Sequence, residues 1–234
     1  MPRSLKIWLA AAALASLPGL AQAHVSIASG PAFANTTQEV VFGVGHGCAG
    51  ADTYRVRVQI PASVTSVRAM RGDFGPATVE RDATGVITAV VWQKADADLL
   101  AEDVGYYKLV LRLKVPNAPF STVYFPTQQT CRAADGTTTT TAWVGLPTDP
   151  AVDGGADEPA PALLVVPARV PGWNKVTVPA AVADLGVYFS DALIVWKGAA
   201  AFSANPATKE LIAATPGVTA LTSLAAADEI WVKY

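Results

Sequence analysis

Apolar and polar side chains alternate with a period of two in several short segments between residues 38 and 146. In residues 54–60 the even positions are apolar or aromatic and the odd ones are Arg or Gln, and in residues 109–115 the odd positions are Leu or Val. This alternation predicts strands with one buried and one solvent-exposed face. Because no helical pattern separates them, the segments predict an all-β sandwich rather than a helical bundle. Further strands are predicted at residues 39–44, 64–70, 86–93, 122–125 and 139–144.

The composition changes sharply between residues 148 and 161. This stretch is dense in Pro, Gly and Asp and has no aliphatic periodicity, which is typical of a linker. We therefore expect a sandwich domain over residues 24–147, a linker over 148–161 and a small α+β domain over 162–234, packed against the sandwich.

The C-terminal part contains one helix whose ends can be recognised. Asn205 is a favourable N-cap and Pro206 suits the first helical position, while Pro216 and Gly217 stop the chain after about three turns. Strands are expected around this helix at residues 173–178, 192–196 and 229–234.

Overall composition excludes two classes of protein. Of the 234 residues, 51% are hydrophobic and 15% are charged, so there is enough apolar surface to offset chain entropy and the chain is not disordered. The 17 basic residues are balanced by 19 acidic ones, and no basic run exists that could neutralise a row of phosphates. Nucleic acid is therefore not the expected partner.

Residues 1–23 have the three parts of a secretory signal peptide. Arg3 and Lys6 supply the positive start, residues 7–17 the apolar core, and Ala21–Ala23 the small-x-small cleavage site. The apolar core is too short for a bilayer span of roughly 20 residues, so we expect no membrane span in the mature chain. The mature protein is expected to be periplasmic or secreted and to begin at His24.

Two cysteines, Cys48 and Cys131, are present. Because an exported protein meets oxidising conditions, we expect them to form a disulfide, with two unpaired buried thiols as the alternative.

The mature chain contains two histidines, His24 and His46, and cleavage would place the first at a free amino terminus. A terminal histidine offers its α-amino nitrogen and its Nδ1 to one metal ion as a chelate, and a second imidazole would complete a three-nitrogen set that suits Cu(II). Copper binding also displaces the amine proton near neutral pH. The alternatives are a chance residue after the cleavage site and, for His46, a surface histidine.

Other chemistries fit the sequence less well. Spacing excludes a paired-cysteine zinc site, and there is no nucleophile elbow and no phosphate-binding glycine loop. Glu39 and Asp52 are acidic candidates for a further ligand, although a solvated face explains each more simply. Tryptophans of the mature chain are expected in the core or between the domains: Trp92, Trp143, Trp173, Trp196 and Trp231.

Several elements in this order resemble the YcnI-like family of exported copper-handling proteins. They are the start His24-Val25-Ser26-Ile27, the turn Gly45-His46-Gly47-Cys48, the strand 55–61, the segment Phe125-Pro126-x-x-Gln129-x-Cys131, the triplet Thr141-Ala142-Trp143, and a tail containing Pro171–Lys175 and Ile194–Gly198.

The resemblance implies an immunoglobulin-like or cupredoxin-like sandwich that binds Cu(II) through the terminal histidine, with a nearby Trp and, in some members, an acidic residue. His24 and Trp143 occupy matching positions. Where some relatives carry Glu after a Val-Pro pair, this chain has Gly45-His46. We therefore expect a metal site formed by His24 and His46, with Trp143 shielding it.

Taken together, the residues and the resemblance predict a non-enzymatic copper chaperone or buffer with a histidine brace, which passes Cu(II) to a copper transporter or a cuproprotein acceptor. One alternative is an oxidative copper enzyme of the polysaccharide monooxygenase type, which would need a flat aromatic surface that the sequence does not make evident. The other is a metal-free β-sandwich interaction module.

Overall fold

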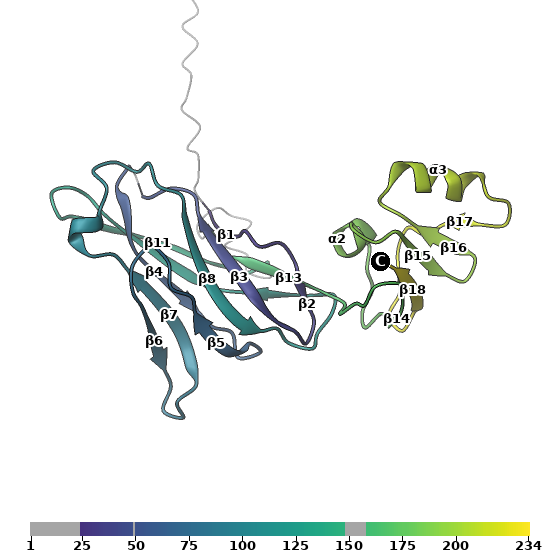
Figure 1. Ribbon diagram of the computed structural model, residues 1–234, viewed down its shortest axis with the longest axis horizontal. Coiled ribbons are helices and arrows are strands. Elements are labelled where there is room, and N and C mark those ends of the chain that lie inside the picture. Colours follow the sequence, from purple (N-terminus) through teal and green to yellow (C-terminus); the bar gives the residue numbers. More distant parts are fainter. Residues whose placement is uncertain (1–23, 49, 148–157) are drawn as a thin grey trace, which may run out of the picture.

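The computed structural model describes residues 24–48, 50–147 and 158–234. The predicted signal peptide and most of the predicted linker lie outside these ranges. Figure 1 shows a larger domain built of sheets and a smaller C-terminal domain, joined by the segment that follows β13. Within the described ranges, no helix is long and apolar enough to cross a membrane.

The larger domain contains three sheets. A four-stranded sheet has the order β1 (Val25–Ile27), β3 (Thr37–Val44), β8 (Tyr107–Lys114) and β5 (Thr65–Ala69). A six-stranded sheet has the order β12 (Glu158–Pro159), β11 (Thr138–Gly145), β10 (Thr127–Arg132), β4 (Asp52–Gln59), β7 (Ile87–Gln93) and β6 (Ala77–Arg81). A third sheet has the order β2 (Ala32–Phe33), β13 (Ala162–Val166) and β9 (Ser121–Tyr124). A single 3₁₀ turn, η1 (Asp96–Asp98), precedes β8.

The core of this domain lies between the two large sheets. Phe42 of β3 meets Phe125 edge to face, with ring centroids 5.3 Å apart, and Val56 and Val58 of β4 are fully buried in the same cluster. Each such side chain contributes roughly 1.5–3 kcal/mol when it leaves water. The fold class is the one predicted, an all-β sandwich followed by a small domain that mixes strands and helices.

Strand β4 departs from its predicted alternation at Tyr54. Its pairing with β10 shifts register between Thr130 and Cys131, so that Thr130 opposes Arg55 whereas Cys131 opposes Thr53. A bulge of this kind leaves one residue unpaired and re-aims its side chain. Tyr54 is therefore only half-buried and lies under the guanidinium of Arg132, 3.9 Å from its ring centroid.

The domain boundary differs from the predicted one. β12 pairs with β11, and β13 pairs with both β9 and β2, so residues up to Val166 belong to the sandwich. The prediction that a linker ends at residue 161 and that the second domain starts at 162 is corrected accordingly. β13 escaped prediction because its sequence Ala162-Leu163-Leu164-Val165-Val166 is continuously apolar and carries no alternation.

The C-terminal domain has a five-stranded sheet and two helices. The sheet has the order β14 (Trp173–Thr177), β18 (Glu229–Lys233), β15 (Ile194–Lys197), β16 (Ala200–Phe202) and β17 (Thr219–Ala220). The helices are α2 (Leu185–Phe189) and α3 (Pro206–Ala214). The helix prediction is confirmed, because Asn205 Oδ1 accepts hydrogen bonds from the amides of Ala207 (2.9 Å) and Thr208 (3.3 Å) at its start.

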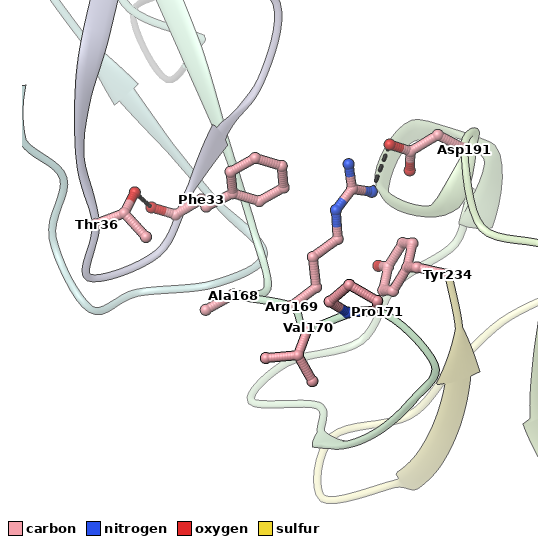
Figure 2. A pocket seen from close by; sticks show the side chains of 8 residues that line it. All are labelled: Phe33, Thr36, Ala168, Arg169, Val170, Pro171, Asp191 and Tyr234. Carbon is pink, nitrogen blue, oxygen red and sulfur yellow. Dashed lines mark hydrogen bonds and ion pairs between the residues drawn. The ribbon is translucent and has the colours of Figure 1, made fainter.

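Contacts at two places join the domains. Arg169 lies between the ring of Phe33 in the sandwich (4.6 Å to the centroid) and that of Tyr234 in the C-terminal domain (4.4 Å), and it forms an ion pair with Asp191 (Figure 2). Phe120 of the sandwich packs against the rings of α2 and its carbonyl accepts a hydrogen bond of 3.3 Å from Tyr188. Burial raises the pKa of Tyr234, although the neighbouring Arg169 opposes this shift.

Candidate metal site

His24 immediately precedes β1, at the end of the β1–β3 pair where Val25 opposes Val44. Its side chain is 44% exposed. Trp143, on β11 of the facing sheet, is buried, and its indole lies 5.2 Å from the His24 imidazole between ring centroids, at an angle of 47°. Two residues predicted for the site, His24 and Trp143, are thus brought together from opposite sheets.

A carboxylate that the sequence did not suggest lies beside them. β12 runs parallel to β11 and places Glu158 opposite Trp143. The Glu158 Oε2 atom is 3.6 Å from His24 Nε2. Glu158 falls in the stretch that reads as a linker, and its strand has only two residues, so no periodicity marks it.

Trp143 is fixed by a buried amide. Its Nε1–H donates to Gln129 Oε1 at 3.2 Å. The Gln129 amide nitrogen in turn donates to the carbonyl of His46 at 2.7 Å and to the hydroxyl of Thr53 at 2.9 Å. Because all these groups are satisfied in the interior, the indole and the turn that carries His46 are held in one fixed arrangement.

His46 has a different carboxylate neighbour. Its Nδ1 is 2.8 Å from the carbonyl oxygen of Gly47 and 3.7 Å from Oδ2 of Asp103, which lies in the loop before β8. The side chain is 39% exposed. His46 thus lies near the carboxylate of Asp103, and His24 near that of Glu158. The role of His46 as a third copper nitrogen stays a prediction.

The turn that carries His46 is tightly constrained. Cys48 and Cys131 form the predicted disulfide, which joins this turn to β10. The Cys48 amide donates to the Ala51 carbonyl (3.2 Å) and the Ala51 amide to the Cys48 carbonyl (3.0 Å). A β-carbon on Gly47 would lie 1.8 Å from the Ala51 carbonyl oxygen, so only glycine fits there.

Asp52, an acidic candidate expected on a solvated face, is instead buried. It forms an ion pair with Lys94 at 2.6 Å, and accepts hydrogen bonds from the Tyr107 hydroxyl (2.6 Å) and the Leu100 amide (2.9 Å). Burial alone would raise the pKa of Asp52, but these three donors outweigh it and hold that pKa below its ordinary value. Asp52 is thus a structural group, and Glu39 lies on the exposed face as expected.

The described part of the chain contains no group of three or more His, Cys, Asp or Glu side chains that could hold a metal ion. A histidine brace does not require such a group, because two of its nitrogens come from one residue. The groups near β1 are the His24 imidazole and the Glu158 carboxylate beside it, and an imidazole is a ligand that suits copper.

Comparison with protein families identifies the larger domain. The family model described as "Domain of unknown function (DUF1775)" matches residues 24–166, more than half of the chain. The chain belongs to the DUF1775 family. YcnI-like proteins carry the DUF1775 domain, so the resemblance found in the sequence is confirmed. The match ends at Val166, the last residue of β13, in agreement with the corrected domain boundary.

Two solved structures are similar to parts of this DUF1775 protein. An uncharacterized protein from Nocardia farcinica, described as having an immunoglobulin-like fold, is 24% identical over 61% of this chain and 98% of its own, with a TM-score of 0.48. BcpA, the major pilin subunit of Bacillus cereus, is 10% identical over 68% of this chain and 45% of its own, with a TM-score of 0.35. No curated protein matches the chain.

Proposed function

We propose that this protein is an exported Cu(II)-binding protein, a chaperone or buffer of copper, and that His24 is its principal ligand. The observation that carries the proposal is the position of the His24 imidazole, beside both the buried indole of Trp143 and the carboxylate of Glu158. The Cys48–Cys131 disulfide supports export, because such bonds persist in oxidising compartments.

The two ring nitrogens of His24 have different tasks in this proposal. Once the chain begins at His24, the α-amine and Nδ1 form the chelate. Nε2 faces Glu158, with 3.6 Å between Nε2 and Oε2. Carboxylates placed behind a metal-bound histidine fix its tautomer and raise its basicity. Glu158 is therefore a positioning residue in this proposal, and Nδ1 is the ring nitrogen that binds copper.

Trp143 shields the metal instead of ligating it strongly. The indole nitrogen is already committed to Gln129, and only 3% of the residue is exposed. A buried ring beside the imidazole limits water on that side of the bound ion. The copper ion is the cargo of the protein, to be passed to a copper transporter or a cuproprotein acceptor.

The experiment uses processed protein beginning at His24 and measures Cu(II) binding by titration and electron paramagnetic resonance. We expect one tight nitrogen-rich site that His24→Ala abolishes. Glu158→Gln should weaken binding about tenfold, in the range known for residues behind a metal ligand, while Glu210→Gln on exposed helix α3 should not change it. Equal affinities for His24→Ala and the parent protein would overturn the proposal.

Two further measurements separate the rival functions. His46→Ala asks whether a third nitrogen comes from the turn, and an unchanged resonance spectrum would leave His46 with a structural role. Consumption of peroxide with release of oxidised sugars by the copper-loaded protein would instead make it an oxidative enzyme of the polysaccharide monooxygenase type.

A further inference from the structure

We propose that the outer face of the C-terminal sheet is a binding platform for an acidic polysaccharide, formed by Trp173, Trp231 and Trp196 with Lys175 and Lys233. The platform lies on strands β14, β18 and β15, which are neighbours in the sheet (Figure 1). The inference is independent of copper binding.

The strand register places these side chains on one face in alternation. Lys175 of β14 and Trp196 of β15 both pair with Trp231 of β18. Two residues further along β18, Lys233 pairs with Trp173 of β14. Residues that pair directly lie on the same side of a sheet, so aromatic and cationic side chains alternate over three strands, across about 10 Å.

The opposite face of the same sheet already supplies the core of the domain. Val176 of β14, Ile230 and Val232 of β18, and Val195 of β15 pack into the C-terminal cluster. Trp173 and Trp231 therefore do not serve the core, and each is 49% exposed in the whole chain. Tryptophan dominates interface energetics when it is covered, and exposed apolar surface framed by polar residues marks binding sites.

The prediction that all tryptophans lie in the core or between the domains is thus wrong for these two. An exposed aromatic surface, which the sequence did not make evident, is therefore present on the C-terminal domain.

The charges on the face favour an anionic ligand. Two lysines and one glutamate lie there, whereas the whole chain has a net charge of −2. Glu229 forms an ion pair with Lys175 at 2.8 Å, and the Lys233 ammonium lies 5.7 Å from the Trp173 ring centroid. An acidic sugar polymer suits this pattern, because its apolar ring faces stack on indoles while its carboxylates meet the ammonium groups.

A lipid surface fits less well. The indoles are carried on paired strands and are half-covered, whereas groups that enter a bilayer interface must protrude from the protein. The Glu229 side chain, 59% exposed at the start of β18, would also oppose an anionic membrane. A polymer that lies along the sheet needs neither protrusion nor a uniformly positive face.

The platform and the metal site lie at different ends of the protein. Strand β3 is eight residues long, or about 26 Å. Its first residue, Thr37, follows β2, whose Phe33 contacts Arg169 at the domain junction. Its last residue, Val44, lies beside β1 and therefore near His24. The platform would therefore anchor the protein to an extracellular polymer without placing that polymer at the copper site.

The test is gel electrophoresis of the metal-free, full mature chain through polygalacturonate, hydroxyethyl cellulose or no polymer. We expect retardation by polygalacturonate that weakens with salt. Trp231→Ala and Trp173→Ala should each reduce the affinity at least tenfold, and Lys233→Gln should reduce both the affinity and its salt dependence. The matched controls, Leu211→Ala and Lys209→Gln on exposed helix α3, should leave the retardation unchanged.

Three results would overturn the proposal. The first is equal mobility in all gels. The second is retardation that Trp231→Ala and Trp173→Ala do not change although both variants unfold at the parent temperature. The third is a different ligand on the same face. Selective binding to phosphatidylglycerol vesicles would make it a lipid surface, and self-association that Trp231→Ala abolishes would make it a dimer surface.

Discussion

The indole of Trp143 lies 5.2 Å from the imidazole of His24, measured between ring centroids, although the two residues come from opposite sheets. Paramagnetic Cu(II) held by His24 should therefore quench the fluorescence of Trp143 strongly. We predict that Trp143→Phe removes most of the copper-dependent loss of emission, whereas Trp92→Phe in the core keeps it. Quenching that persists unchanged in Trp143→Phe would place the copper elsewhere.

Removal of the buried carboxylate of Asp52 should destabilise the sandwich severely. Lys94 is 5% exposed and lies over the ring of Tyr107, so Asp52→Asn leaves an ammonium buried without its counter-charge. Breaking a buried pair in this way costs about 3–5 kcal/mol of unfolding free energy. Urea denaturation measures this loss of unfolding free energy, with Asp98→Asn, a substitution of an exposed carboxylate, as the control. A loss below about 1 kcal/mol would contradict this interpretation of the pair.

The same carboxylate makes stability depend on acid pH. The pKa of Asp52 is lower in the folded protein than its ordinary value of 3.8, so the unfolded chain binds the proton more tightly. Its stabilising contribution is complete above about pH 4 and is lost as pH falls through the lowered pKa. We predict that the acid-dependent part of the unfolding free energy becomes smaller in Asp52→Asn. If the unfolding free energies of the parent and of Asp52→Asn fell equally as the pH was lowered, the acid dependence would not come from Asp52.

Reduction of the Cys48–Cys131 bond should lower stability substantially. The bond spans 83 residues, for which the chain-entropy model gives about 4.5 kcal/mol. We expect the double variant Cys48→Ser, Cys131→Ser to unfold at lower urea than the parent, and a reductant to shift the parent but not the variant. An unshifted parent midpoint would show that the bond contributes little.

The two domains should lose their fixed arrangement when Arg169 is truncated. Its guanidinium contacts Phe33 on one side and Tyr234 on the other (Figure 2). In Arg169→Ala we predict a larger radius of gyration by X-ray scattering and faster proteolysis between Val166 and Trp173. Lys209→Ala removes one exposed charge and should behave like the parent. Unchanged scattering would mean that the Phe120 contacts with α2 suffice.

Much of the fold could be predicted because some long strands alternate cleanly and turn residues bound the others. The segments that became β4 and β8 place most of their apolar residues on one face, and helix α3 begins and ends close to the predicted residues. Alternation could not find β13, which is apolar throughout, or β12, which has two residues. The domain boundary was misplaced for that reason.

The candidate site was predictable only in part. His24 stands out by its place after a cleavage signal, and Trp143 by its place in a family motif. Glu158 carries no comparable signal, because its proximity depends on a parallel pairing between β12 and β11. In β18 both faces carry large side chains. The alternation shows that Trp231 and Lys233 share a face, but it does not show which of the two faces packs against the core.

The α-amine of His24 is the feature on which the copper proposal depends most. Its direct measurement is a competition titration with Cu(II) of two proteins, one beginning at His24 and one with a single alanine added before it. The added residue converts the amine into an amide and removes one arm of the chelate. We predict that it weakens binding at least tenfold, about 1.4 kcal/mol. Equal affinities of the two proteins would contradict the account.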